Sequence, residues 1–245
     1  MSDDLSAGAL AAALPRRAVR TYPAVLSTEA DAVAWARADA PAGAVVVADY
    51  QASARGRGGL PWTGRPGRDL GFSLVLRPAL IPDDEGWVYV AAALAVLEVV
   101  EDGEATIEWP DRVLSDGRLV ADVAGHAGLG PQGVAWVIVN VQLYDVQTPR
   151  GPLIAQLAEA IETFQQPEPE TLARFREHCT TVGQEVVAHI IPVWPDGVQI
   201  AGTAVSVLED GALVIERADG SRVAVRPQHL ARLETPDTPL PETWT

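Results

Sequence analysis

The chain has 245 residues and a formal net charge of −15, from 33 acidic and 18 basic side chains. All 18 bases are arginine, and lysine is absent. This absence excludes mechanisms that need a side-chain amine of this chain, such as Schiff-base chemistry or a P-loop lysine. The acidic balance opposes nucleic-acid binding, because neutralising phosphates is the main source of such affinity.

The composition is that of a soluble globular protein, and the length suits one large domain with at most a small appendage. A single cysteine excludes a disulfide framework and a multi-cysteine metal site, so we expect no structural metal. The longest apolar run, residues 87–97, is too short to cross a bilayer, and no membrane association is expected. Asp3 and Asp4 precede the N-terminal Ala/Leu stretch, the reverse of a secretory signal, which favours a cytoplasmic location.

In the first third of the chain, Ser27-Thr28-Glu29 predicts the capped start of a helix over residues 30–38. A buried strand over 44–48 follows, and a second over 72–76. The loop between them, residues 53–71, is rich in Gly, Pro and Arg, and loops of this length are usually functional or disordered. Residues 55–77 carry five arginines against one acid, which indicates an anion site, whereas a solvated flexible loop is the alternative.

The rest of the chain alternates strands and helices before turning to short strands alone. The predicted helices are 85–100, 152–165 and 168–182, and the predicted strands are 106–109, 119–123 and 134–143. Three further strands, 198–208, 212–216 and 221–225, are joined by Asp-Gly pairs typical of hairpins. They predict a β-meander of about forty residues, small for a free domain.

Four segments resemble, in order, motifs of the biotin/lipoate protein ligase superfamily. Residues 48–62, ADYQASARGRGGLPW, resemble the ligand loop Q-T-x-G-R-G-R-x-G-R-x-W, and residues 66–78 resemble its continuation into a strand ending L-R-P. Residues 108–111, EWPD, resemble K-W-P-N-D, and residues 137–141, VIVNV, resemble the strand G-I-G-I-N-V. The segment 202–215 is similar to the small SH3-like cap of these ligases.

The sequence resembles a divergent, biotin-protein-ligase-like member of this superfamily. This resemblance implies an α+β fold. The class II synthetase-like ligase fold is a mixed sheet packed by helices, with a small C-terminal SH3-like β-domain. On this basis we expect an N-terminal arm over 1–22, a ligase-like domain over 23–192, an SH3-like β-meander over 193–234 and a Pro-rich tail over 235–245. About two dozen residues precede Val25, too few for the DNA-binding module of some relatives.

The family activates biotin, or lipoate in relatives, with ATP and passes the acyl group to a lysine of a carrier domain. The resemblance therefore implies ATP and a biotin- or lipoate-like acid as ligands, and a small carboxylic acid or its adenylate as the bound species. A carrier-domain protein is the implied partner, and a homodimer is compatible with the resemblance.

The ligand-binding residues implied by the resemblance are Ser27, Thr28, Gln51, Arg55, Gly56, Arg57, Trp62 and Asn140. The two arginines would clamp a carboxylate and the α-phosphate, with Gly56 letting backbone amides approach. The glutamine would bind a polar ring, the indole would cover adenine, and the Ser-Thr pair would face the acyl ring. Each residue also has a structural interpretation: a helix cap for Ser27 and Thr28, a core residue for Trp62, and a loop-to-strand link for Gln51.

The departures from the family pattern concern phosphate handling. Glu108 stands in place of the first family lysine, and Leu119 in place of the strand lysine that touches both the acyl carboxylate and the α-phosphate. Arg112 and Arg118 are the candidates for the missing cation, although Arg118 needs a bulge or a one-residue slip to reach the same face. Trp136 and Ile138 stand where the family has strand glycines, and Ala54 and Leu60 replace two loop residues.

Three hypotheses follow from these departures. The first is an active acyl-protein ligase with arginine replacing lysine. The second is a degenerate ligase-like protein that binds a small acid or nucleotide without completing transfer, which the two lost lysines favour. The third is a non-catalytic partner-binding protein. Because both family lysines are absent, the sequence leaves open whether the chain is an enzyme.

Overall fold

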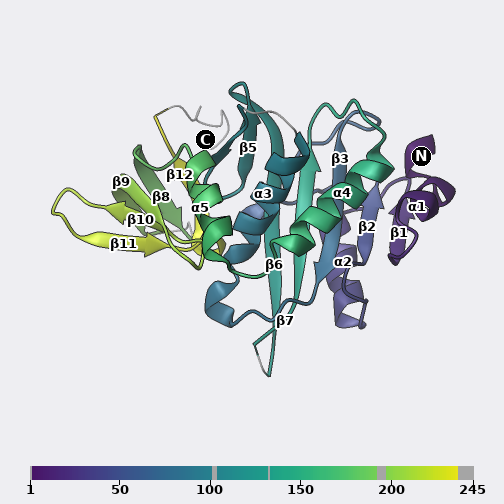
Figure 1. The fold of residues 1–245 in the computed structure, drawn as a ribbon, viewed down its shortest axis with the longest axis horizontal. Coiled ribbons are helices and arrows are strands. Elements are labelled where there is room, and N and C mark those ends of the chain that lie inside the picture. Colours follow the sequence, from purple (N-terminus) through teal and green to yellow (C-terminus); the bar gives the residue numbers. More distant parts are fainter. Residues whose placement is uncertain (1, 101–103, 132, 192–196, 237–245) are drawn as a thin grey trace.

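A computed structural model describes residues 2–100, 104–131, 133–191 and 197–236, in two β-sheets with helices packed around the larger one (Figure 1). The described strands of the larger sheet lie in the order β1-β2-β3-β7-β6-β5-β4, with β1 parallel to β2 and the other pairs antiparallel. Their bounds are Val19–Tyr22 (β1), Val45–Ala48 (β2), Leu70–Leu76 (β3), Thr106–Glu108 (β4), Arg112–Ser115 (β5), Arg118–Gly130 (β6) and Gly133–Leu143 (β7).

The smaller sheet is antiparallel, and its described strands lie in the order β11-β10-β9-β8-β12. Their bounds are Glu185–Ile190 (β8), Gln199–Val207 (β9), Leu213–Glu216 (β10), Arg222–Val225 (β11) and Leu230–Glu234 (β12). This sheet lies beside the β4–β5 end of the larger sheet, far from the N-terminal strands (Figure 1).

Helices cover both faces of the larger sheet. Their bounds are Ala7–Ala13 (α1), Thr28–Arg37 (α2), Trp87–Val100 (α3), Arg150–Thr163 (α4) and Pro169–His178 (α5), with 3₁₀ turns at Asp3–Leu5 (η1), Arg57–Gly59 (η2), Pro82–Asp84 (η3) and Pro227–His229 (η4). Helices α3 and α4 cross one face side by side (Figure 1), whereas α2 packs on β2, β3 and β7 from the other face. None of the helices in the described segments has both the length and the apolar content needed to cross a bilayer.

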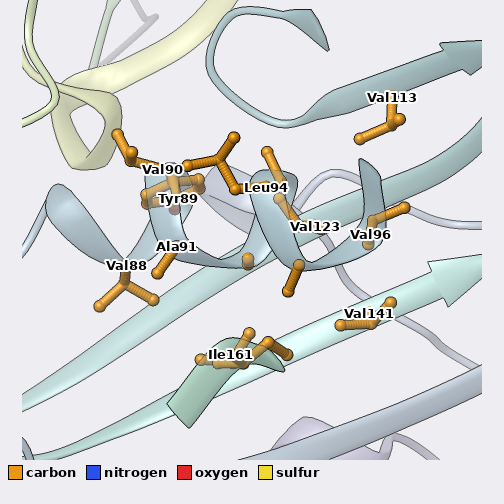
Figure 2. Packing of buried hydrophobic residues seen from close by; sticks show 14 of the residues in the cluster. Val88, Tyr89, Val90, Ala91, Leu94, Val96, Val113, Val123, Val141 and Ile161 are labelled. Atoms are coloured by element: carbon orange, nitrogen blue, oxygen red, sulfur yellow. The ribbon is translucent and has the colours of Figure 1, made fainter. Parts of the chain in front are cut away.

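The main core lies between the sheet and α3, which is buried along most of its length (Figure 2). Leu94 and Val96 of α3 lie in one cluster with Val123 of β6, Val141 of β7 and Ile161 of α4. Successive side chains of a strand point to opposite faces of the sheet. Because Val123 and Val141 point toward α3, the residues next to them in the sequence point toward the α2 side. That second face carries the polar residues described below.

The α+β fold with a mixed sheet packed by helices is confirmed, and the capped helix at Ser27 is α2, where Ser27 Oγ accepts a bond from the Ala30 amide. Several elements differ from the sequence prediction. The predicted helix 168–182 ends at His178, because Cys179 adopts an extended conformation and pairs with Ile107 of β4. Strands β1, β5, β8 and β12 and helix α1 were not predicted.

The domain limits proposed from sequence stay a prediction, but three observations bear on them. Strand β8 starts at Glu185, ahead of the expected limit at 193, and belongs to the smaller sheet. The expected arm over 1–22 contains α1 and β1, and its Leu5 and Leu10 are fully buried. Residues 237–245 of the expected tail lie outside the described residues.

Candidate ligand-binding site

A row of polar side chains crosses the α2 face of the larger sheet, at the end where α2 begins. Ser73 of β3 and Asn140 of β7 are register partners, and both side chains are buried. Helix α2 covers the neighbouring part of this face with an apolar cluster that includes Val46, Val75 and Ile138. The polar row therefore begins where the apolar cover of α2 ends.

Four of these polar side chains form one hydrogen-bonded chain. The Thr28 amide donates to Gln51 Oε1 at 2.8 Å, and Thr28 Oγ1 lies 3.0 Å from the same oxygen. Ser73 Oγ lies 2.8 Å from Thr28 Oγ1 and 2.6 Å from Asn140 Oδ1. Buried polar groups need such partners, so the predicted site residues Thr28, Gln51 and Asn140 are brought together and satisfy one another. Ser27 lies beside them as the cap of α2.

A glycine of β3, Gly71, allows the side chains beside this row to approach the backbone closely. A Cβ on Gly71 of β3 would overlap the side-chain amides of Gln51 and Gln142. The two amides thus lie directly over the glycine, beside a small cavity of about 20 Å³. A cavity of that size holds about one water molecule, so it is far smaller than a biotin-sized ring.

Two bulky side chains of β7 lie on this face at the positions that the resemblance compares with strand glycines. Ile138 and Trp136 of β7 are buried on the α2 face, and the Trp136 indole lies against Gly128 of β6, where a Cβ would overlap it. The His126 ring lies 5.7 Å from this indole, and its Nδ1 lies 3.0 Å from Glu29 Oε1. This part of the α2 face is therefore filled by bulky side chains of the chain itself.

The arginine loop, residues 53–69, turns back on itself at η2. Arg55 and Pro61 form an isolated antiparallel bridge, and the Trp62 indole packs against Gly56, where a Cβ would overlap Trp62 Nε1. Gly56 is therefore required for packing against the indole as well as for any approach of a ligand to the backbone. Trp62 is half-buried, which leaves part of the indole accessible.

The two loop arginines have opposite environments. The Arg57 side chain is 7% exposed; its Nε donates to Asp111 Oδ2 at 2.8 Å, and its Nη1 donates to the backbone carbonyls of Leu230 and Ala231 at the start of β12. Arg55 is exposed and donates to the Gly59 carbonyl at 2.9 Å. Arg57 thus joins the loop to the β4–β5 turn and to the smaller sheet, while Arg55 lies at the surface.

A cleft of about 240 Å³ opens at this junction. Its walls come from the arginine loop, the β4–β5 hairpin, β6 and the end of β12, and they include Arg57, Trp62, Glu108, Asp111, Arg112 and Asp122. Arg112 Nη1 donates to Glu108 Oε2 at 2.5 Å, and Arg112 Nε lies 4.0 Å from Asp122 Oδ1. Glu108, in the position of a family lysine, therefore neutralises the nearest candidate replacement cation.

Asp122 has the most perturbed carboxyl group of this cleft. Burial raises the pKa of Asp122 to about 6, and the hydrogen bond from Tyr144 Oη to Asp122 Oδ2, 2.6 Å long, offsets part of that rise. Burial also raises the pKa of the Tyr144 hydroxyl, so it is the donor of this pair at neutral pH. The cleft therefore holds a carboxyl group that titrates near neutrality.

The two candidate cations differ in place. Arg112 lines the cleft, whereas Arg118 is exposed at the turn between β5 and β6, opposite Ser115 in the register. The pairing of β5 with β6 shifts between Val113 and Leu114, so an irregularity of the expected kind lies close to Arg118. Among the described residues, no group of three or more His, Cys, Asp or Glu side chains could hold a metal ion.

Comparisons with known proteins agree with this architecture. No family model matches the chain. The biotin–[acetyl-CoA-carboxylase] ligase of Mycobacterium tuberculosis is 26% identical over 216 residues, which cover 78% of this chain and 80% of that protein. The biotin protein ligase of Aquifex aeolicus, solved with biotin and ATP, has a TM-score of 0.65 at 19% identity over 89% of this chain and 99% of its own. Together, the sequence match and the fold support a biotin-protein-ligase-like member of the biotin/lipoate ligase superfamily.

Other relatives of this ligase family match less of the chain or are less similar in sequence. The bifunctional ligase/repressor BirA of Bacillus subtilis is 29% identical over half of this chain, a match that spans 39% of that protein. The biotin acetyl coenzyme A carboxylase synthetase of Helicobacter pylori has a TM-score of 0.61 at 17% identity over 86% of this chain and 100% of its own. At these identities the solved structures support the fold, and the role of each side chain must come from this chain.

Three residues of the polar row and the cleft were not singled out from the sequence as site residues. Ser73 links Thr28 to Asn140, and its signal is a polar residue at an inward position of an apolar strand. Asp111 belongs to the EWPD segment that resembles a family motif, but its ion pair with Arg57 had no local signal in the sequence. Asp122 interrupts the apolar alternation of β6, and that interruption could have marked it.

Proposed function

We propose that the chain binds a small carboxylic acid, biotin or lipoyl-like, and/or a nucleotide, with adenylation machinery that is degenerate. The ion pair between Glu108 and Arg112 carries this proposal. In the family pattern a lysine precedes the Trp-Pro pair, and here a carboxylate occupies that place and neutralises the nearest arginine of the cleft. The accessible indole of Trp62 and the cleft beside it support ligand binding.

The loss of the two family lysines should affect the rate of adenylation more than the binding of the ligand. In adenylation a carboxylate oxygen attacks the α-phosphorus of ATP and pyrophosphate leaves with the electrons of the broken P–O bond. Loss of one preorganised donor to the developing charge typically lowers a rate by about 10²–10³-fold. Both family lysines are replaced, by Glu108 and Leu119, and Arg57 is bonded to Asp111 and to backbone carbonyls. We therefore expect weak or absent standard biotinylation.

An active acyl-protein ligase is the second candidate, favoured by Arg112 in the wall of the cleft. In that case the acyl-adenylate passes its acyl group to a carrier lysine, whose amine attacks the acyl carbon and releases AMP. A non-catalytic partner-binding protein is the third candidate. A cytoplasmic location and a homodimer remain predictions under all three.

ATP–pyrophosphate exchange separates the first two candidates. We expect no exchange above background with biotin, lipoate or octanoate, and exchange that depends on one of these acids would establish the active ligase. Titration calorimetry with the same acids, ATP and a stable biotinyl-adenylate analogue tests binding itself.

A matched pair of variants ties binding to the cleft. Trp62→Ala should abolish the heat of binding, whereas Trp35→Ala, which removes a half-buried indole of α2 that stacks on Arg20, should not. No heat with any of these ligands would refute the binding proposal and leave the partner-binding candidate.

A further inference from the structure

Every arginine in the wall of the 240 Å³ cleft is paired with a carboxylate. Arg57 pairs with Asp111, Arg112 with Glu108, and Arg232 with Glu234. The lining itself contains three arginines and three carboxyl groups, Asp122 being the third, so its formal charges cancel when all are ionised. The cleft is thus close to neutral in a protein whose net charge is −15.

A neutral cleft of paired arginines is a poor site for a triphosphate. Polyphosphates are normally bound by arginine or lysine side chains whose donors are directed at the ligand. Here a triphosphate would compete with Asp111 and Glu108 for the guanidinium groups and would approach three carboxyl groups of its own sign. Within the described part of the chain no cluster of acidic side chains or histidines is arranged to hold the cation that usually accompanies a triphosphate.

The same cleft offers what a nucleoside needs. Trp62 presents a half-buried indole on which a planar base can stack. A carboxylate accepts several hydrogen bonds, so Glu108 and Asp111 can keep their arginine bonds and still accept from ribose hydroxyls. The volume of about 240 Å³ lies below the range of roughly 300–1,000 Å³ typical of ligand pockets, which favours a compact ligand over an extended one.

We propose that this cleft binds a nucleoside, or a nucleoside carrying a single phosphate ester, in preference to a nucleoside triphosphate. The inference rests on the proposed function, which places nucleotide binding at this cleft, and it names the charge state of the ligand. The Asp111 and Glu108 ion pairs set that preference, because they take up the arginines that would otherwise bind the β- and γ-phosphates.

The test is a calorimetric titration of the full chain at pH 7.5 with adenosine, AMP and ATP, the last with and without Mg²⁺. We expect adenosine and AMP to bind at least about tenfold more tightly than ATP, because each arginine among the described lining residues of the cleft already pairs with a carboxylate. 2′,3′-Dideoxyadenosine should bind about tenfold or more weakly than adenosine, because it lacks the hydroxyls that the carboxylates accept.

A charge variant tests the cause of the preference. Glu108→Gln releases Arg112 from its ion pair and should raise the affinity for ATP by about tenfold, with a much smaller change for adenosine. Glu216→Gln is the matched control, because Glu216 pairs with Arg222 on the exposed β10–β11 hairpin, away from the cleft. It should leave all affinities unchanged.

The outcomes separate this inference from the function on which it rests. Tighter binding of ATP than of adenosine, with or without Mg²⁺, would overturn the inference and leave the proposed function standing. Binding of biotin or lipoate without any adenine compound would also overturn it, while supporting the acid-binding part of the function. No heat with any acid or adenine compound would overturn both.

Discussion

The guanidinium of Arg57 and the carboxylate of Asp111 form an ion pair, with Nε 2.8 Å from Oδ2, across the junction of the arginine loop and the β4–β5 turn. The same guanidinium donates to two carbonyls of β12, so one side chain connects three separate segments. An arginine that resembles a ligand clamp in sequence therefore has a positioning role between the two sheets.

Replacing Arg57 should destabilise the fold strongly. Its side chain is 7% exposed and that of Asp111 is 13% exposed, so Arg57→Ala leaves a nearly buried carboxylate without its partner. Removal of one member of a buried ion pair typically costs about 3–5 kcal/mol of the free energy of unfolding. Urea unfolding followed by circular dichroism measures this change.

Arg55→Ala is the matched control, because Arg55 is exposed and makes a single bond to its own loop. It should cost at most about 0.5 kcal/mol. If the two variants lost similar stability, Arg57 would have no positioning role. The double variant Arg57→Ala/Asp111→Ala should recover part of the loss, with a coupling energy of about 0.5–3 kcal/mol.

Gly56→Ala should displace the Trp62 indole. Gly56 has φ −97°, which alanine adopts easily, so the penalty is steric and not conformational. The added Cβ would overlap Trp62 Nε1, and such overpacking typically costs about 1–3 kcal/mol. The measurements are urea unfolding and the tryptophan emission spectrum, which should shift as the indole becomes more exposed.

The penalty of Gly56→Ala should disappear when Trp62 is already alanine, because the clash then has no partner. Gly8→Ala serves as the control for the substitution itself, since nothing lies within 4 Å of a Cβ at that position in α1. This control should be neutral or slightly stabilising. An equal loss from Gly56→Ala in both Trp62 backgrounds would show that the indole is not the obstacle.

The strands and helices that were predictable from sequence are those with strong local signals. Strand β2 and helix α3 are continuous apolar runs, and α2 starts at the Ser27 cap. Strand β5 has no such signal, because Arg112–Ser115 alternates weakly and gains its strand conformation from pairing with β6. The end of α5 is likewise tertiary, since Cys179 leaves the helix to pair with β4.

The sequence predicted which residues lie in the site better than it predicted the contacts that they make. Gln51, Thr28 and Asn140 do converge, because a resemblance in order along the chain implies the same strand register. The pairing of Arg57 with Asp111 was not predictable, because it depends on how the loop folds against the smaller sheet. The sequence places five arginines in one stretch, but two of them, Arg57 and Arg68, pair with carboxylates that are distant in the sequence, Asp111 and Asp145.

Ser73→Ala should destabilise the polar row. Ser73 is fully buried and bridges Thr28 and Asn140, so its loss leaves Asn140 Oδ1 without the bond it makes at 2.6 Å. A buried polar group left unsatisfied costs about 1–3 kcal/mol. Thr163→Ala, which removes an exposed hydroxyl bonded to the Glu159 carbonyl, should change stability by no more than about 0.5 kcal/mol. Urea unfolding of both variants measures the two changes in the free energy of unfolding. Equal small losses would mean that the bonds of Ser73 contribute nothing to stability.

Asp122 should make the stability of the protein fall as pH rises from about 4 to about 6. Burial raises the pKa of Asp122 from 3.8 to about 6, so in this range the folded protein holds a proton that the unfolded chain has released. Stability contributed by this group is therefore fully present below pH 4 and is lost as pH rises through 6. For this mostly buried side chain, a rise of the pKa from 3.8 to about 6 corresponds to about 3 kcal/mol of the free energy of unfolding.

Asp122→Asn should remove this fall, because asparagine does not titrate, so the stability of the variant relative to the parent should increase between pH 4 and 7. Tyr144→Phe should move the fall to higher pH, because it removes the hydrogen bond that lowers the pKa of Asp122. Urea unfolding at half-unit pH steps measures all three profiles, and contributions of other titrating groups cancel in the differences. Parallel profiles for the parent and Asp122→Asn would mean that the pKa of this carboxyl group has its ordinary value in the folded protein. They would contradict a rise of this pKa caused by burial.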